Sequence, residues 1–179
     1  MDMRIESVAA VLFSPDRKEV LLVQRRDVPV WVLPGGGIDP GESAEKAVIR
    51  EVLEETGFAV KADRLVGRYV PINRLAKPTA VFECRVQEGM MSLTTETRGI
   101  GFFPLDALPA LVPPPFREWI EDARGVREPV VKRLNGVTYW TLIQNLLFHP
   151  LLVIRFLLAR AGFAINSSGD KQQSKYEGK

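Results

Sequence analysis

The sequence predicts a mixed α/β domain, and three features indicate this fold class. Short apolar runs rich in β-branched residues alternate with turn residues, as is typical of strands. A glycine-rich loop in the first third of the chain runs into a segment of strong helix formers. Further apolar runs and a second helical segment follow. With 179 residues, the chain is long enough for one such domain and an appendage.

Three strands are predicted before the glycine-rich loop. Residues 8–13 and 20–23 are apolar, and residues 14–18 between them read Ser-Pro-Asp-Arg-Lys, which has turn chemistry. We therefore expect these two strands to form a hairpin. Residues 31–33, Trp-Val-Leu, are expected to form a short third strand.

The loop and the helix after it carry the clearest local signals. Residues 34–41 hold four glycines and two prolines, which exclude regular structure. Residues 43–56 are rich in Ala, Glu and Lys and predict a helix. Gly57 stands where a left-handed residue would end that helix.

After this helix the chain is expected to form three more strands, at residues 65–70, 79–86 and 99–103. A short helix over residues 115–123 opens within three consecutive prolines. Cys84 alternates with polar neighbours, so we expect it at a buried strand position rather than as a reactive thiol.

The predicted domain spans residues 1–127, and an apolar helical extension spans residues 128–165. Residues 139–165 are rich in Leu, Phe and Ile, but two arginines in this run would be costly at bilayer depth, so short helices are expected rather than a membrane span. The extension could pack on its own domain, form a homodimer or lie on a membrane surface, and protein packing is favoured. Residues 166–179 are polar and are expected to be disordered.

The composition argues against several classes of protein. Lys and Arg total 24 against 22 Asp and Glu, a net charge of +2 without charged blocks, so no nucleic-acid partner is expected. The N-terminus lacks the apolar segment of a secretory signal, and a single cysteine cannot form an internal disulfide, so we expect a cytoplasmic protein. With His149 as the one histidine, a histidine metal site or a Ser-His-Asp triad is difficult to build. Catalysis would therefore rely on carboxylates.

Three glutamates are predicted to share one face of the first helix. Glu51, Glu54 and Glu55 are spaced i, i+3 and i+4, so their carboxylates would repel one another by on the order of a few tenths of a kcal/mol per pair unless a cation lies between them. Mg²⁺ or Mn²⁺ suits such a site, because both ions prefer oxygen ligands. Arg50 can hold a carboxylate through two parallel hydrogen bonds. Glu42 stands at the helix entrance, beside glycines that allow the backbone to approach a ligand closely.

The spacing of these residues resembles the Nudix box. Gly36 is followed by five residues and Glu42, and then by seven residues and the run Arg-Glu-Val-Leu-Glu-Glu-Thr-Gly-Phe, which starts at Arg50. Every specified position of that motif matches, and the similarity extends over residues 7–123. It implies an α/β/α sandwich with a mixed β-sheet and a hydrolase acting on phosphoanhydride bonds.

The resemblance also implies roles for single residues. Arg50 would orient the carboxylates, and Glu54 is the first candidate for the base that takes a proton from the attacking water. Many members take the base from a glutamate just before a later strand, where this chain has Gly99, with Glu96 three residues earlier. This departure leaves the base open. The ligands of Mg²⁺ or Mn²⁺ would be Glu51, Glu54, Glu55 and the carbonyl oxygen of Gly36, with Glu42 a further ligand or the partner of one.

Four residues outside the acidic face are candidates for substrate contact. Arg25 and Arg26 follow an apolar strand and suit substrate phosphates, although surface arginines are equally common there. Trp31 could stack on a base or pack under the loop, and packing is favoured. Gly37 adjoins the expected ligand carbonyl.

The expected partner is a small-molecule nucleotide. The leading hypothesis is a pyrophosphohydrolase that cleaves a nucleoside diphosphate linked to another moiety, such as ADP-ribose, a nucleotide sugar or a dinucleoside polyphosphate. One alternative is a house-cleaning nucleoside triphosphate pyrophosphatase, and another is a non-catalytic module that senses a nucleotide. Hydrolysis is favoured because no glutamate of the motif is lost.

Overall fold

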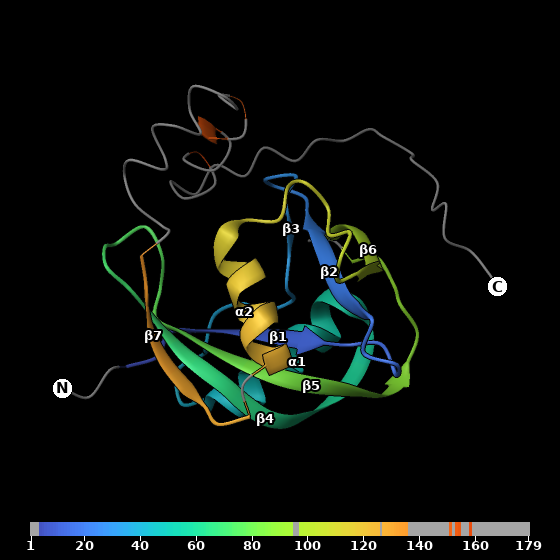
Figure 1. Cartoon of the computed structure of the whole chain (residues 1–179), viewed down its shortest axis with the longest axis horizontal. Coiled ribbons are helices and arrows are strands. Elements are labelled where there is room, and N and C mark those ends of the chain that lie inside the picture. Colours follow the sequence, from blue (N-terminus) through green and yellow to red (C-terminus); the bar gives the residue numbers. More distant parts are fainter. Residues whose placement is uncertain are drawn as a thin grey trace.

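The computed structural model describes residues 4–94, 97–125 and 127–135, together with Leu151, Val153, Ile154 and Leu158. Strands dominate the described chain up to residue 135, and two helices cover them (Figure 1). In chain order the elements are β1 (Ser7–Leu12), β2 (Glu19–Arg25), β3 (Trp31–Val32), α1 (Ala44–Thr56), β4 (Phe58–Pro71), β5 (Thr79–Gly89), β6 (Thr97–Pro104), α2 (Pro114–Gly125) and β7 (Val130–Leu134).

The strands form two sheets. The larger sheet has the order β1-β5-β4-β7 and is mixed, because β4 and β5 are antiparallel whereas β1 pairs with β5, and β7 with β4, in parallel. The smaller sheet has the order β3-β2-β6 and is antiparallel. The mixed α/β class predicted from the sequence is confirmed.

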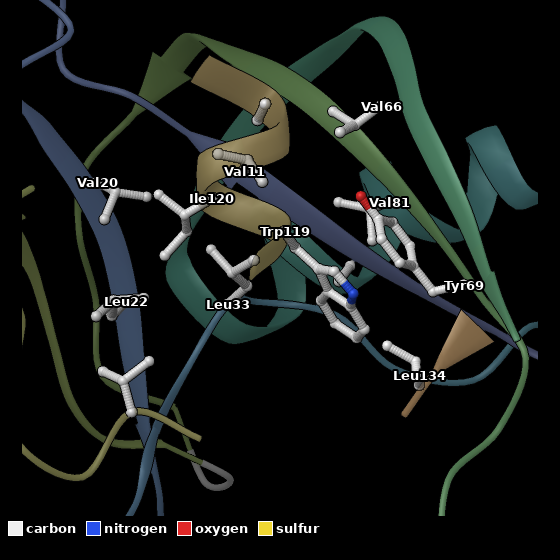
Figure 2. Packing of buried hydrophobic residues seen from close by; sticks show 13 residues of the cluster. Val11, Val20, Leu22, Leu33, Val66, Tyr69, Val81, Trp119, Ile120 and Leu134 are labelled. Atoms are coloured by element: carbon white, nitrogen blue, oxygen red, sulfur yellow. The ribbon is translucent and has the colours of Figure 1, made fainter. Parts of the chain in front are cut away.

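β1 lies between two apolar cores, one on each face of the larger sheet. Val8, Ala10 and Leu12 pack in the core that includes α1. Ala9 and Val11 point the other way, as alternate residues of a strand do, and pack in the core that includes α2 (Figure 2). The domain is therefore an α/β/α sandwich, as the resemblance implied.

α1 begins and ends at the capping residues that the sequence predicts. The Ser43 hydroxyl oxygen accepts a hydrogen bond from the Lys46 amide and caps the N-terminus of the helix. Gly57 has a φ of 77° and donates its amide to the Leu53 carbonyl oxygen, which ends the helix. The two caps position the acidic residues of α1 relative to the loop that precedes it.

The hairpin expected between the first two strands is wrong, because β1 and β2 belong to different sheets. Just after β1, Phe13 forms an isolated antiparallel bridge with Val20 of β2. β1 instead bonds to the glycine-rich loop, where the Val8 amide donates to the Gly36 carbonyl oxygen at 2.9 Å. Backbone hydrogen bonds therefore hold the loop against the sheet.

The predicted domain boundary is also corrected. The sequence assigns residues 128–165 to a helical extension, but Val130–Leu134 forms β7, an edge strand of the larger sheet. Leu134 is buried in the core on the α2 side, so the hydrophobic effect holds this strand to the domain. Most of the remaining extension, His149 and the tail at residues 166–179 lie outside the described residues.

Beyond residue 135, four positions of the extension are described, and all four are helical: Leu151, Val153, Ile154 and Leu158. Over the part of the chain that the structure describes, none of the helices combines the length and the apolar character needed to cross a bilayer.

Candidate functional site

The glycine-rich loop lies directly against the acidic face of α1. Gly35 donates its amide to Glu55 Oε2 at 2.9 Å. A Cβ on Gly36 would lie 2.5 Å from the carboxyl carbon of Glu51, so a residue without a side chain is what allows this approach. The fold therefore brings together the two segments of the motif.

Arg50 lies at the centre of the acidic group. Its Nε and Nη2 donate to the two carboxylate oxygens of Glu42 at 3.0 and 2.9 Å, which is a bidentate pair. Nη1 donates to Glu51 Oε1 at 2.9 Å and to Glu54 Oε2 at 3.2 Å. Nη2 also donates to the Gly37 carbonyl oxygen at 3.0 Å. One guanidinium thus gathers three carboxylates and a carbonyl from the loop and the helix.

The charges of this group influence one another. The hydrogen bond from Arg50 holds the pKa of the Glu42 carboxyl below its ordinary value, and the same bond raises the pKa of the Arg50 guanidinium. The side chains of Glu42 and Glu51 are 16% and 14% exposed, whereas that of Glu54 is 59% exposed. Of these three carboxylates, Glu54 is therefore the one most open to solvent and to a bound molecule.

The chemistry of this donor set fits a hard divalent cation. Three carboxylates around one guanidinium leave two negative charges, and oxygen ligands are what Mg²⁺ and Mn²⁺ prefer. Among the described residues, however, no three His, Cys, Asp or Glu side chains form a ready metal-binding group. Arg50 holds Glu51 and Glu54, while Glu55 accepts from the Gly35 amide. The three predicted ligands on α1 therefore have different partners in this structure: Arg50 for Glu51 and Glu54, and Gly35 for Glu55.

The two arginines near the end of β2 have different surroundings. Arg25 is exposed, forms a two-bond ion pair with Asp27 and lines a cavity. Arg26 is partly buried and donates to the Thr97 carbonyl oxygen at 3.0 Å. Arg25 therefore lies where a ligand could reach it, whereas Arg26 holds the start of β6.

Trp31 packs against β6. Its ring meets that of Phe103 edge-on, with centroids 4.6 Å apart. A Cβ on Gly99 would lie 3.0 Å from the indole, so Trp31 occupies the space that a side chain at position 99 would need. This geometry supports packing over base stacking for Trp31. Glu96 lies outside the described residues.

A cavity of about 390 Å³ adjoins the glycine-rich loop, and Gly36 and Gly37 line it. The lining also includes residues of β1, β2, β3 and the segment leading into β5, and Phe116 and Trp119 of α2. These two aromatic residues could not be recognised from the sequence, because aromatic residues on an amphipathic helix are usually core residues. Their place in the cavity lining depends on where the fold positions α2.

Comparisons with known proteins match both the fold and the motif. A family model described as the NUDIX domain covers residues 3–123. A candidate 8-oxo-dGTP diphosphatase of Bacillus subtilis (strain 168) is 35% identical over 122 residues, which are 68% of this chain and 82% of the relative. An ADP-ribose pyrophosphatase of Methanocaldococcus jannaschii is 34% identical over 106 residues, 56% of this chain and 62% of the relative. This chain therefore spans less than two thirds of the second relative.

Solved structures share the fold. An ADP-ribose pyrophosphatase from Streptococcus suis 89-1591 superposes with a TM-score of 0.57 at 30% identity, covering 71% of this chain and 96% of that chain. A NUDIX hydrolase from Nitrosomonas europaea superposes with a TM-score of 0.61 at 26% identity, covering 76% of this chain and 97% of that chain. The family-model match ends before β7 begins.

Proposed function

The chain belongs to the Nudix hydrolase family, and from this premise we propose that it is a divalent-metal-dependent pyrophosphohydrolase acting on a nucleoside diphosphate linked to another moiety. The proposal rests on the hydrogen bonds of the Arg50 guanidinium, which donates to Glu42, Glu51 and Glu54 beside the glycine-rich loop. ADP-ribose, nucleotide sugars and dinucleoside polyphosphates are the candidate substrates.

Mg²⁺ or Mn²⁺ would be held by carboxylates of α1 and of the loop. The Gly36 carbonyl oxygen already accepts from the Val8 amide, and its second lone pair remains available as a ligand. When bound, the ion supplies Lewis-acid chemistry at the bridging phosphates. The ligand set of the proposal is Glu42, Glu51, Glu54, Glu55 and the carbonyl of Gly36.

The chain's own side chains perform the remaining tasks in this proposal. Arg50 keeps Glu42 ionised and orients both Glu42 and Glu51, because both carboxylates accept from its rigid guanidinium. A Glu54 carboxylate oxygen takes the proton of the attacking water, since Glu54 is the most exposed of the three carboxylates that Arg50 holds. Glu55 holds the loop in place through the Gly35 amide.

Arg25 and Gly37 are the proposed substrate contacts. Both line the cavity, and the Arg25 guanidinium suits a phosphate oxygen. For Arg26 and Trp31 we favour a structural role instead, because the first holds the start of β6 and the second packs on Phe103.

Product analysis over a substrate panel tests the proposal. The panel contains ADP-ribose, nucleotide sugars, dinucleoside polyphosphates, and normal and oxidised nucleoside triphosphates, each with Mg²⁺, with Mn²⁺ and with a chelator. Metal-dependent release of a nucleoside phosphate and of the phosphorylated second moiety from one of these linked substrates is the expected result. Absence of turnover of every member would contradict it and favour a nucleotide-sensing module.

A nucleoside triphosphate pyrophosphatase is the second candidate. The relative from Bacillus subtilis that is named for 8-oxo-dGTP, matched over 82% of its length, is the observation that favours it. The same panel separates the two candidates, because a triphosphatase of this kind releases pyrophosphate and a nucleoside monophosphate.

A further inference from the structure

Asp27 holds the arginine that ends β2. Arg25 Nε donates to Asp27 Oδ1 at 2.9 Å, and Arg25 Nη2 donates to Asp27 Oδ2. Two parallel hydrogen bonds of this kind fix the plane of a guanidinium as well as its position. Arg25 lines the cavity beside the glycine-rich loop, whereas Asp27 is absent from the lining in the part of the chain that the structure describes. Asp27 can therefore act on a ligand there through the arginine that it holds.

Of the two partners, Asp27 is the more firmly anchored. Its side chain is 19% exposed, whereas that of Arg25 is 50% exposed. Asp27 Oδ1 also accepts from the amide of Val28 at 2.7 Å, and Val28 is buried. Backbone hydrogen bonds close the connection between β2 and β3, from the Arg25 amide to the Val30 carbonyl oxygen and from the Val30 amide to the Val28 carbonyl oxygen. The turn therefore sets where the carboxylate lies.

The Asp27 carboxyl is held in its charged form. Burial by itself would raise its pKa, but the hydrogen bonds and the charge of Arg25, together with the Val28 amide, hold the pKa below the ordinary value of 3.8. Hydrogen bonds between charged partners are shorter and stronger than those between neutral ones. The charge of Asp27 therefore contributes to the order of Arg25.

The smaller sheet is irregular at the same place. Gln24 of β2 faces Gly99 of β6. Arg25, the next residue, faces Thr97, so the register shifts between the two positions. A bulge of this kind changes the direction of nearby side chains and is common beside active sites. Arg26 then bonds to the Thr97 carbonyl oxygen, and it is Arg25 rather than Arg26 that lines the cavity.

We propose that Asp27 is a positioning residue, which holds the Arg25 guanidinium in the orientation that binds a phosphate oxygen of the substrate. This inference rests on the proposed function and adds to it a residue outside the cavity lining. An arginine without such a partner would have to be ordered when the substrate binds, and that ordering costs free energy. Loss of Asp27 should therefore weaken substrate binding rather than slow the chemical step.

Two substitutions of Asp27 separate positioning from a purely structural role in the turn. Asp27→Asn keeps an oxygen for the Val28 amide but loses the charge and the second acceptor for Arg25. Asp27→Glu keeps both carboxylate oxygens for Arg25, but its longer side chain loses the short contact with the Val28 amide. Positioning predicts that KM rises about fivefold in Asp27→Asn, with kcat within about twofold of the parent, and that Asp27→Glu stays within about twofold in both. A structural role predicts the reverse order of the two variants.

A double-mutant cycle shows whether Asp27 acts through Arg25. In an Arg25→Gln chain, Asp27→Asn should raise KM no further, because the side chain that it orders is already lost. Asp63→Asn is the matched control and should keep the parental KM, since Asp63 pairs with Arg85 and neither residue lines the cavity. The panel substrate that the parent hydrolyses fastest serves for these kinetics.

A binding measurement tests the same role without hydrolysis. Inorganic pyrophosphate supplies a diphosphate group without a base or a sugar, and chelator prevents turnover. The Arg25 Nε–H signal, assigned by its absence from Arg25→Gln, reports on the guanidinium by NMR. Pyrophosphate should shift this signal in the parent and should bind about fivefold more weakly to Asp27→Asn.

Three results would overturn this inference: parental KM in Asp27→Asn, an equal rise in KM when Arg25 is already replaced, or an Arg25 signal that does not respond to pyrophosphate in the parent. Any of them together with metal-dependent hydrolysis of a panel substrate would refute the positioning role alone. A pyrophosphate response that weakens in Asp27→Asn, without hydrolysis of any panel member, would refute the proposed function alone.

Discussion

Arg50 is one residue whose hydrogen bonds hold several acidic side chains together. Its planar guanidinium donates to both oxygens of Glu42 and, from another nitrogen, to Glu51 and Glu54. A lysine would offer one compact charge and lose the bidentate contact.

Glu54→Gln is expected to lower kcat by about 10²- to 10⁴-fold, because the amide cannot accept the proton of the attacking water. Thermal unfolding should change little, since the Glu54 side chain is 59% exposed. Steady-state kinetics and a thermal melt measure both effects. Glu45→Gln, an exposed glutamate in the first turn of α1, is the matched control and should keep parental kcat. A Glu54→Gln enzyme as fast as the parent would show that the base lies elsewhere.

Glu42 should give the domain a pH-dependent stability. Its ordinary pKa of 4.5 is lowered on folding by the hydrogen bond from Arg50. A carboxyl shifted in this direction stabilises the fold above the unfolded pKa, and the contribution is lost as pH falls through the folded pKa. The parent should therefore exceed Glu42→Gln in free energy of unfolding at neutral pH, and the difference should shrink below about pH 4.5. Urea unfolding at stepped pH measures it, and a difference that grows in acid would contradict the prediction.

Gly36→Ala should damage activity more than stability. The new Cβ would lie 2.5 Å from the Glu51 carboxyl, which ends a flexible side chain and can move away at small cost. We expect kcat/KM to fall about 10²-fold through the displaced carboxylate, with little change in the urea midpoint. Gly125→Ala is the control, because a Cβ there meets no atom within 4 Å. Parental kcat/KM in Gly36→Ala would indicate that the position of Glu51 does not matter.

At the scale of elements, a buried polar network joins α2 to the larger sheet. Asp122 of α2 is 8% exposed and accepts from the Tyr69 hydroxyl of β4 at 2.8 Å and from Lys132 Nζ of β7 at 2.6 Å. The network determines how α2 lies over β4, and therefore where α2 places Trp119 in the cavity lining. Packing of this helix thus serves the candidate site as well as the core.

Asp122→Asn is expected to lower the free energy of unfolding by about 2 kcal/mol, because a buried charge-assisted contact is replaced by a weaker neutral one. Asp63→Asn provides the matched control, since Asp63 pairs with Arg85 at the surface. Its effect should stay below about 1 kcal/mol. Urea unfolding of both variants gives the comparison, and equal losses would contradict a special role for the buried network.

For the whole molecule, the position of β7 determines where the domain ends. Leu134 belongs to the core on the α2 side, although β7 follows the segment that the family model covers. We propose that the helical extension starts beyond Asn135 and packs on this domain or on a second copy. The cytoplasmic location expected from the sequence stays a prediction.

A chain that ends at Asn135 should fold, whereas one that ends at Arg127 should lose cooperative unfolding, because it lacks β7 and exposes the core that Leu134 covers. Circular dichroism melts and size-exclusion chromatography measure this, and equal behaviour of the two chains would show that β7 is dispensable.

Flotation with anionic lipid vesicles compares the chain ending at Asn135 with the intact chain. Binding by the intact chain alone would favour the membrane alternative for the extension.

Features that local chemistry specifies could be predicted from the amino-acid order. The bounds of α1 follow from Ser43 and Gly57, which satisfy backbone groups within a few residues of themselves. The motif spacing identified the family and, through it, the α/β/α sandwich. Cys84 is 3% exposed in β5, and burial raises the pKa of its thiol to about 12, so the expected buried position is confirmed.

Which distant segments meet could be learned only from the folded domain. β1 pairs with β5 and the glycine-rich loop rather than with β2, and β7 joins the sheet through β4. Trp31 occupies the space beside Gly99, and α2 brings Trp119 to the cavity. These contacts depend on how separate elements share a core, and apolar burial is non-directional, so no local pattern in the chain specifies the partner.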